Sequence, residues 1–418
     1  MPLRALDGAA APARLPVTLA VTLADIRAAA ARIEGAVLRT PTLPSHAVSA
    51  AAGVKVYLKL DNLQATGAFK ERGAANRIAL LTARERAAGV IAMSAGNHAQ
   101  AVARHAALAG IAATIVMPKF TPATKVVRTE GWGARVVLHG ESLAESAAHA
   151  HALAQRDGLT FIHPYDDPGV IAGQGTMALE MLEDVPAIDT LVFPVGGGGL
   201  LAGCAAAARE LRPGLTVFGV EVEAYAPMAQ RLAGLPVKVG GPTVAEGIAV
   251  RDVGEVPLAL IRQMGLEVLV VPERAVEEAI ALLAEGAKLV AEGAGAAALA
   301  AVLAFPERFA GRCVGLPVCG GNIDARALSN VLLRQLLRDG RLLRLHFDIP
   351  DRPGMLADIS ARISALGGNV IEVQHQQLLG APTVQSTELH LMVEVRDAAQ
   401  GAAIIAALEA GQYVVRRG

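Results

Sequence analysis

A lysine among small residues is the first candidate for covalent chemistry in this sequence. Lys70 ends the stretch Gln64-Ala-Thr-Gly-Ala-Phe-Lys70, where a helical pattern begins. Because burial removes solvation from an ammonium group, the pKa of Lys70 should fall, and the neutral amine could form a Schiff base. Most lysines are exposed instead, so a surface lysine is the alternative. Phe69 could either stack on a flat ring or fill the core.

Four consecutive glycines, Gly196–Gly199, form the second candidate. They lie between the apolar run Leu191–Val195 and a helical pattern over Leu200–Leu211. Glycines let backbone N–H groups converge on a phosphate, and the helix N-terminus adds partial positive charge. The run is not a P-loop, because no Gly-Lys-Ser/Thr follows, and it is not the dinucleotide fingerprint in its usual place. A phosphate site is favoured over a flexible turn.

The third candidate is Ser94-Ala-Gly-Asn-His-Ala-Gln100, which follows an apolar run and opens a helix that continues to about Leu108. Free amides at a helix N-terminus, together with Ser94, Asn97 and His98, suit a carboxylate. Ser94 could instead serve only as a helix N-cap. A lone histidine is more often structural than catalytic, so neither residue decides the matter by itself.

The fourth candidate is Val318-Cys-Gly-Gly-Asn322, directly after the apolar run Cys313–Pro317. Cys319 would then lie at the carboxyl end of a strand, where ligands bind in open α/β sheets. The alternative is an inert, buried cysteine.

Short apolar runs bounded by Gly or Pro must position these segments. Helix-length segments separate the runs, and Thr22-Leu-Ala-Asp25 predicts a capping box for a helix that continues to about Glu34. This alternation predicts an α/β protein with two wound, mostly parallel sheets buried on both faces. The predicted strands are Val56–Lys59, Gly89–Met93, Ala113–Met117, Ala134–Leu138, Leu191–Val195, Val217–Glu221, Glu267–Val271 and Cys313–Val318.

The pattern changes after about residue 340. Strands are expected over Leu342–Asp348, Val370–Gln377, Glu388–Val395 and Tyr413–Arg416, with helices over Met355–Leu366 and Ala398–Leu408 and a loop over Ile349–Gly354. The resulting β-α-β-β-α-β order is that of a small ferredoxin-like domain.

Composition excludes several classes of protein. The formal net charge of -1, without a long basic run, argues against nucleic-acid binding. Three cysteines are too few for a disulfide framework, which favours a reducing cytoplasm. Charges at Arg4, Asp7 and Arg14 interrupt the N-terminus, so no signal peptide is expected. No charge-free apolar stretch reaches membrane length.

Together, these motifs resemble the threonine and serine dehydratases (ammonia-lyases) of pyridoxal phosphate fold type II, and residues 342–418 resemble an ACT domain. The resemblance implies an N-terminal extension at 1–20 and a catalytic region at 21–335. A small domain at about 55–155 would be inserted into a large domain at 21–54 and 156–335. Further motifs that carry the resemblance are Arg39-Thr-Pro-Thr42, Thr121-Pro-Ala-Thr-Lys125, His163-Pro-Tyr-Asp-Asp-Pro168, Ile171-Ala-Gly-Gln-Gly-Thr176, Ala245-Glu-Gly-Ile-Ala-Val250, Asp351-Arg-Pro-Gly354 and Gly368-Asn-Val-Ile371.

The resemblance assigns a role to each candidate. Lys70 would carry pyridoxal 5'-phosphate as a Schiff base and then take the α-proton from an amino-acid substrate. The β-hydroxyl would leave as water, so that threonine gives 2-oxobutanoate and ammonia, and serine gives pyruvate. The remaining implied contacts are Phe69 and Gly247 with the two faces of the cofactor ring, Gly196, Gly197, Gly198 and Gly199 with its phosphate, Asn97 with its 3-hydroxyl, Cys319 with its pyridine nitrogen, and Ser94, Ala95, Gly96, Asn97 and His98 with the substrate carboxylate.

Other functions stay open at this stage. A serine racemase or a β-hydroxyaspartate dehydratase is the nearest alternative, although Ala95 stands where racemases have a second, proton-donating serine. Another alternative is an amino-acid sensor without catalytic activity, against which the presence of Lys70 argues. Glu221 matches one ligand of the divalent metal that some relatives bind, but an expected aspartate is missing from Val222–Met228, so no metal is predicted.

The C-terminal domain suggests regulation in amino-acid metabolism, for which isoleucine biosynthesis is one expectation. An amino-acid effector would contact Arg352, Gly354, Met355, Asn369 and Val370. The alternative is a domain that only dimerises, and the chain is expected to form a dimer or tetramer.

Overall fold

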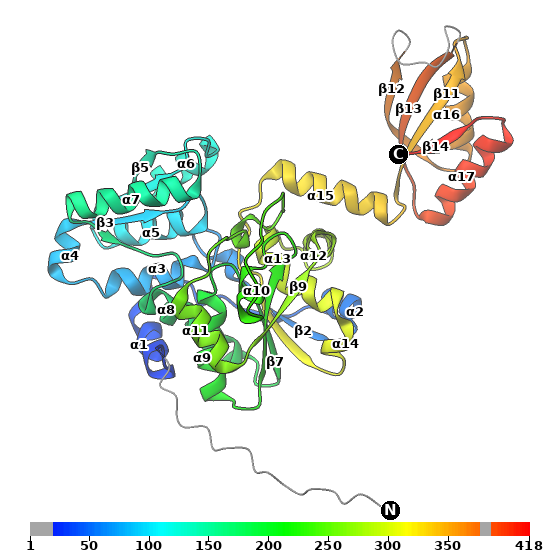
Figure 1. Ribbon diagram of the computed structural model, residues 1–418. Coiled ribbons are helices and arrows are strands. Elements are labelled where there is room, and N and C mark those ends of the chain that lie inside the picture. The colour runs from blue at the N-terminus through cyan, green and yellow to red at the C-terminus, as the bar shows by residue number, and fades with distance from the viewer. Residues whose placement is uncertain (1–19, 377–385) are drawn as a thin grey trace, which may run out of the picture. The chain divides into compact units, whose positions relative to one another are not determined.

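A computed structural model describes residues 20–376 and 386–418 of the chain (Figure 1). The expected N-terminal extension at 1–20 therefore lies almost entirely outside the described residues. The chain divides into two compact units. The first comprises the residues up to Ala279 together with Ala287–Asn322, and the second comprises Ile280–Gly286 together with Ile323–Gly418.

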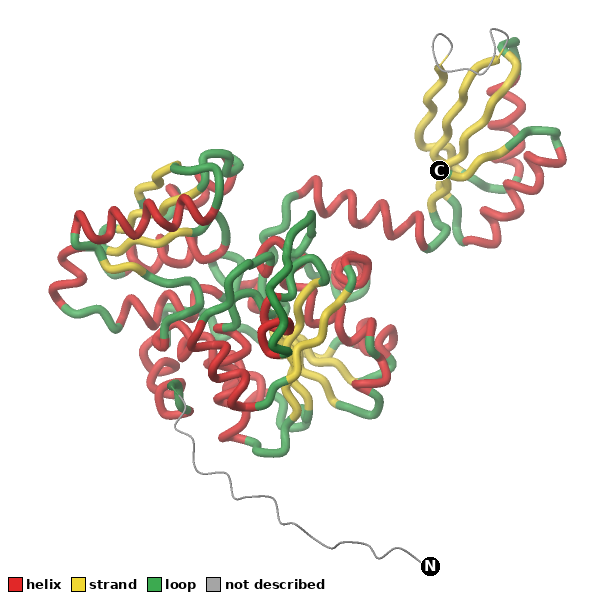
Figure 2. Tube along the Cα trace, in the orientation of Figure 1, coloured by secondary structure: helices red, strands yellow, loops and turns green. Residues whose placement is uncertain are grey.

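The larger sheet of the first unit has six strands, and helices cover both of its faces (Figure 2). Its pairings are parallel except for the antiparallel pair at one edge, β1 with β2. The central strand β7 is buried at every residue, as expected for an apolar run between two layers of helices. In spatial order, the strands are β1 (Thr42–Pro44), β2 (Lys55–Lys59), β10 (Cys313–Pro317), β7 (Thr190–Pro194), β8 (Thr216–Val222) and β9 (Glu267–Val271).

The smaller sheet of the first unit has four parallel strands. In spatial order they are β5 (Arg135–Leu138), β4 (Ala113–Met117), β3 (Val90–Met93) and β6 (Thr160–Phe161). The expectation that every strand is buried on both faces is wrong for β5 and for β9, because each lies at the edge of its sheet. Both end residues of β5 and Glu267 of β9 are exposed.

The sheets divide the chain differently from the expected small domain at about 55–155. The strand β2 belongs to the six-stranded sheet, where it pairs with β10, whereas β6 pairs with β3 in the four-stranded sheet. Strand membership depends on pairing across the fold, which apolar runs along the chain do not specify. Two short strands, β1 and β6, were not predicted at all.

The helices of the first unit follow the predicted alternation. Thr22 caps α1 with the predicted capping box. The helices are α1 (Leu23–Ile33), α2 (His46–Ala52), α3 (Lys70–Ala79), α4 (Ala83–Ala88), α5 (Asn97–Leu108), α6 (Ala123–Glu130), α7 (Leu143–Asp157), α8 (Pro168–Asp184), α9 (Gly199–Leu211), α10 (Pro227–Leu232), α11 (Glu255–Met264), α12 (Glu273–Glu285, which ends in the second unit), α13 (Gly293–Ala304) and α14 (Pro306–Phe309), with 3-10 turns η1 (Asp61–Leu63) and η2 (Glu246–Ile248).

Glycines in α8 let this helix approach two others at backbone distance. A Cβ at Gly173 would lie 2.5 Å from the carbonyl oxygen of Arg72 in α3. A Cβ at Gly175 would lie 2.8 Å from the carbonyl oxygen of Gly203 in α9. Because α3 begins at Lys70 and α9 begins within the glycine run, these contacts fix the distance between two predicted parts of the site.

The second unit contains α15 (Ala325–Arg338) and an antiparallel sheet in the order β12 (Asn369–Gln376), β13 (Ser386–Glu394), β11 (Leu342–Pro350), β14 (Val415–Arg417). Helices α16 (Met355–Ala365) and α17 (Ala398–Ala410) complete the predicted β-α-β-β-α-β order around an aliphatic core. The strand β11 runs two residues into the segment expected to be a loop. None of the described helices has the length and apolar character needed to cross a membrane.

Candidate active site

The structure brings the segments around Lys70 and Cys319 into direct contact. The amide of Phe69 donates a hydrogen bond to the carbonyl of Cys319 at 2.9 Å, and Ala68 forms an isolated β-bridge with Gly320. The amide of Gly321 also donates to the carbonyl of Gly67 at 2.9 Å. Two motifs that are 250 residues apart in the chain therefore form one surface.

Lys70 is half-buried at the first position of α3. Its Nζ donates a hydrogen bond to the carbonyl of Pro164 at 2.8 Å and lies over the ring of Phe69 at 5.2 Å. Loss of hydration lowers the pKa of Lys70 to about 8, although Cys319 and Glu292 oppose this shift. The sequence predicted this direction, and a lowered pKa gives the amine the nucleophilic form near neutral pH.

The glycine run connects β7 to α9, with Gly198 as the N-cap of the helix at a φ of 93°. Within the described residues, none of the amides of Gly196, Gly197 and Gly198 donates to another backbone carbonyl. A Cβ at Gly197 would lie 2.1 Å from the ring of Tyr165, so a side chain cannot be accommodated there. Bare amides at the start of a 13-residue helix form an anion site, which suits a phosphate.

The N-terminus of α5 carries the predicted carboxylate-binding turn. Ser94 is not the N-cap, because Gly96 occupies that position, and Ser94 Oγ accepts a hydrogen bond from the Gly96 amide at 3.1 Å. His98 is buried, and its Nε2 bonds the carbonyl of Ile162 at 2.9 Å. Burial, with the charge of Lys70, lowers the pKa of His98 to about 3, so its ring is neutral and acts as a structural donor.

Two residues to which the sequence analysis assigned no role, Glu292 and Asn322, contact Asn97. Asn97 Nδ2 donates to Glu292 Oε1 at 2.6 Å, and Asn322 Nδ2 donates to Asn97 Oδ1 at 2.8 Å. Glu292 is the sole charged residue between Lys288 and Glu307, directly before an Ala- and Gly-rich helix. A single carboxylate in such an apolar stretch is the feature of the sequence that could have marked Glu292 as a functional residue.

Cys319 is buried, and desolvation followed by repulsion from Asp61 raises the pKa of its thiol well above the usual value. The group is therefore a neutral thiol. It can exchange a weak hydrogen bond with a ring nitrogen but cannot form an ion pair with it.

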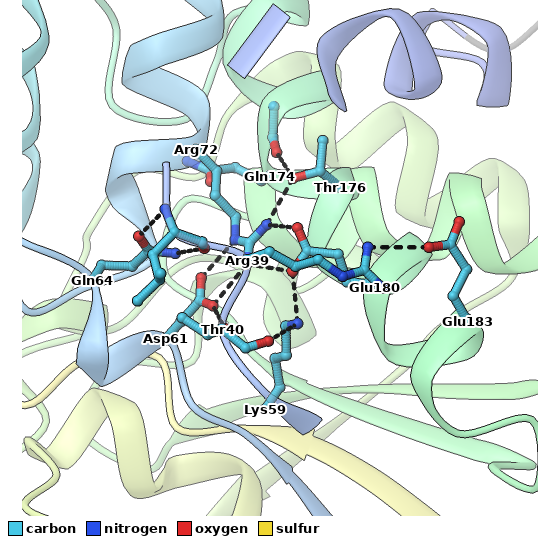
Figure 3. Close-up of polar contacts among 12 residues, drawn as sticks. Arg39, Thr40, Lys59, Asp61, Gln64, Arg72, Gln174, Thr176, Glu180 and Glu183 are labelled. Carbon is cyan, nitrogen blue, oxygen red and sulfur yellow. Dashed lines mark hydrogen bonds and ion pairs between the residues drawn. The ribbon is translucent and has the colours of Figure 1, made fainter. Parts of the chain in front are cut away.

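A buried polar network anchors the helix that carries Lys70 (Figure 3). The guanidinium of Arg72 bonds Asp61 at 2.6 Å and Glu180 at 2.6 Å, which joins α3 to η1 and α8. Lys59 is fully buried, and its Nζ lies 2.6 Å from Glu180 and 3.6 Å from Asp184. Removing one member of the network would leave a charged partner in the protein interior without compensation. The intact network therefore fixes the position of the first turn of α3.

Taken together, the residues present fit pyridoxal phosphate. The amine of Lys70 has a lowered pKa, the glycine run offers unpaired amides, and Asn97 has one N–H in reserve. Gly247 also lies in this neighbourhood, because a Cβ on it would be 3.5 Å from Glu292 Oε1.

Glu221, the residue considered for a metal, is engaged elsewhere. Its carboxylate accepts hydrogen bonds from the amides of Met228 and Ala229, both at 2.8 Å. Across residues 20–376 and 386–418, no group of three or more His, Cys, Asp or Glu side chains is arranged to hold a metal ion.

The second unit has a hollow of about 570 Å³ beside the loop between β11 and α16. Three of the predicted effector contacts line it, namely Arg352, Gly354 and Met355. Asn369 and Val370 are not among its lining residues; they begin β12, where Asn369 Nδ2 lies 3.4 Å from Glu394 Oε2.

Comparisons with known proteins agree with this geometry. Residues 33–320 match the sequence model of the family described as pyridoxal-phosphate dependent enzyme, and residues 341–416 match that of the ACT domain. An L-threonine ammonia-lyase of Thermotoga maritima is 40% identical over 95% of this chain and 99% of its own length. Maize serine racemase has a similar structure, with a TM-score of 0.71 and 35% identity over 76% of this chain and 99% of its own. The processed form of threonine deaminase isoform 2 from Solanum lycopersicum has a TM-score of 0.70 and 34% identity over 74% of this chain and 91% of its own.

Proposed function

This chain belongs to the pyridoxal-phosphate dependent enzymes, and on that premise we propose that it deaminates L-threonine to 2-oxobutanoate and ammonia, and L-serine to pyruvate. One observation carries the choice of reaction. The 40% identity to an L-threonine ammonia-lyase extends over 95% of this chain, and therefore includes the ACT domain as well as the catalytic region.

In this proposal, Lys70 holds the cofactor and then acts as the base that removes the α-proton. A pKa of about 8 leaves a usable fraction of its amine unprotonated near neutral pH. When bound, pyridoxal phosphate supplies an electron sink for the negative charge that develops at the α-carbon. The amides of Gly196–Gly199 would hold the phosphate, and Phe69 and Gly247 would border the ring.

The start of α5 binds the substrate carboxylate. The free amides of this turn and the Ser94 hydroxyl face an anion with the positive end of a 12-residue helix behind them. His98 is held by Ile162 and contributes its backbone amide rather than its neutral ring. This grip fixes the α-carbon relative to Lys70, so that the proton is removed by a positioned amine.

Ala95 directs the chemistry toward elimination. Racemisation needs a proton donor on the face opposite Lys70, and a methyl group cannot donate a proton. Cys319, a neutral thiol, would offer the pyridine nitrogen no carboxylate partner, which we infer favours loss of the β-hydroxyl.

The ACT domain suggests regulation, and we propose that an amino acid binds at the hollow beside Arg352, Gly354 and Met355. A domain that only dimerises is the alternative. We also propose a homo-oligomer located in the cytoplasm, in keeping with the free thiols of Cys204, Cys313 and Cys319.

The test is a 2-oxo acid assay of the full-length protein with L-threonine and L-serine, with and without branched-chain amino acids. Threonine should give 2-oxobutanoate, and Lys70→Ala should lose both the activity and the visible absorbance of the bound cofactor. Chiral chromatography should detect no D-serine. Absence of oxo acid from both substrates would contradict the assignment, and abundant D-serine would replace it with a racemase.

A further inference from the structure

Three side chains from distant parts of the first unit form a continuous chain of hydrogen bonds. Asn322 follows β10, Asn97 begins α5, and Glu292 precedes α13. The distances are 2.8 Å from Asn322 Nδ2 to Asn97 Oδ1 and 2.6 Å from Asn97 Nδ2 to Glu292 Oε1. The three side chains are therefore linked by hydrogen bonds, although up to 225 residues separate them in the sequence.

The chain of bonds leaves one orientation for each amide. Asn322 Nδ2 donates one N–H to Asn97 Oδ1 and the other to the carbonyl of Thr66, at 2.7 Å. If the Asn322 amide were reversed, its oxygen would face the Thr66 carbonyl, which offers no proton. Asn97 must therefore turn its oxygen to Asn322 and its nitrogen to Glu292. One N–H of Asn97 is then left for a ligand.

Two glycines make room for the Glu292 carboxylate. A Cβ on Gly320 would lie 2.5 Å from Glu292 Oε1, and one on Gly247 would lie 3.5 Å from it. The Glu292 amide donates to the Gly320 carbonyl at 3.0 Å, which fixes the main chain. Glu292 occupies the N-cap position of α13 but makes no side-chain capping bond. Its side chain is thus directed at Asn97 rather than at its own helix.

The titratable groups around Glu292 come from four elements. Lys70 begins α3, Lys125 lies in α6, Glu246 begins η2, and Cys319 follows β10. Burial raises the pKa of Glu292 to about 7, while the bond from Asn97 and the lysines oppose the shift. Burying a carboxylate against a neutral amide is costly, and such a cost is tolerated mainly at functional sites.

On the basis of the proposed function, we propose that Glu292 and Asn322 are positioning residues that hold the Asn97 amide with its remaining N–H toward the ring oxygen of the bound cofactor. Without Glu292, the Asn97 nitrogen loses its acceptor, and only the bond from Asn322 restrains rotation of the amide. Without Asn322, the opposite end of the amide loses its partner. Neither residue needs to touch the cofactor to act in this way.

The test measures the dissociation constant of pyridoxal 5'-phosphate by titrating the resolved full-length protein and following the visible absorbance band. Glu292→Ala and Asn322→Ala should each weaken binding roughly tenfold, the equivalent of about one hydrogen bond. Glu292→Gln keeps an acceptor for Asn97 and should remain within about threefold of the original protein. In the Asn97→Ala background, Glu292→Ala should add less than about twofold, because the two residues share one function.

Glu221→Gln is the matched control. Glu221 is also a buried carboxylate whose pKa is raised to about 7, but it accepts its bonds from the amides of Met228 and Ala229. Its substitution should leave the dissociation constant and the band unchanged. The thermal midpoint of each cofactor-free variant separates a positioning role from a loss of folding, and Glu292→Gln and Asn322→Ala remain informative if Glu292→Ala does not fold.

The outcomes are distinct. Unchanged affinity in Glu292→Ala and Asn322→Ala, additive losses with Asn97→Ala, or equal loss in Glu292→Gln would each overturn the positioning role. A protein with unaltered residues that forms no visible band with the cofactor would overturn the proposed function instead.

Discussion

Replacing Lys70 by methionine should stabilise the cofactor-free protein at pH 7 while abolishing its activity. Methionine keeps most of the side-chain volume but removes the ammonium group. Lys70 is half-buried without a carboxylate in its hydrogen-bond contacts, and it donates to the carbonyl of Pro164. The folded protein thus bears a desolvation cost for the ammonium form of a lysine whose neutral amine the proposed catalysis requires.

The magnitude follows from the pKa of Lys70. A fall from 10.5 to about 8 is a difference of about 2.5 units, which corresponds to about 3.4 kcal/mol at 1.36 kcal/mol per unit. Because solvent reaches part of the side chain, we expect a measured gain of about 1–2 kcal/mol. For a large domain this corresponds to a rise in the thermal midpoint of roughly 2–5 °C.

The pKa shift also determines how the stability difference between Lys70→Met and the unaltered protein changes with pH. The folded pKa lies below the unfolded pKa, so the cost is fully present below pH 8, where both states are protonated. Between pH 8 and 10.5 the folded state loses its proton first, and the cost disappears. The advantage of Lys70→Met over the unaltered protein should therefore shrink across this interval and vanish near its upper end.

The assay is thermal or urea unfolding of the cofactor-free chain at pH 7 and at the alkaline end of the interval. Lys59→Met is the contrasting variant, because Lys59 is fully buried but paired with Glu180 at 2.6 Å. Its loss removes one of the two cations that pair with Glu180, while Arg72 remains, and should destabilise the protein by about 1–3 kcal/mol. A lower midpoint for Lys70→Met at pH 7, or a gain that persists at high pH, would refute the reasoning.

Further predictions concern the other parts of the molecule. Arg72→Ala leaves the buried carboxylate of Asp61 without its paired cation, while Glu180 keeps Lys59, and should cost about 3–5 kcal/mol of stability, measured by urea unfolding; a loss below about 1 kcal/mol would show that the network is dispensable. Gly197→Ala places a methyl group against the ring of Tyr165 and should weaken cofactor binding at least roughly tenfold in an absorbance titration, whereas unchanged binding would remove the glycine run from the phosphate site. If residue 95 faces the substrate opposite Lys70 as proposed, Ala95→Ser supplies a hydroxyl there and should produce D-serine from L-serine, detected by chiral chromatography; no D-serine would contradict that placement. Arg352→Ala should raise the half-saturating concentration of an amino-acid effector by roughly tenfold and leave the basal rate unchanged, and an unaltered response in the rate assay would place the effector elsewhere.

Local signals predicted most of the elements. The capping box at Thr22 is a contact over three residues, so the sequence is enough to specify it. The apolar runs predicted the strands β4 and β9 at their observed bounds. Local signals did not predict the exposure of the edge strand β5 or the short strands β1 and β6. Their placement depends on which neighbours they pair with rather than on their own residues.

The sequence by itself determined that Lys70 begins a helix and that a glycine run leads into another, because helix starts and turns depend on neighbouring residues. Only the tertiary structure decided what surrounds them. The bond between Asn97 and Glu292 spans 195 residues, and the Arg72–Glu180 pair spans 108. Such contacts form where helices cross and strands end, and no local preference of Glu292 or Asn322 encodes them. The physical reason is that burial and hydrogen-bond partners are properties of the packed chain, whereas backbone preference is a property of each segment.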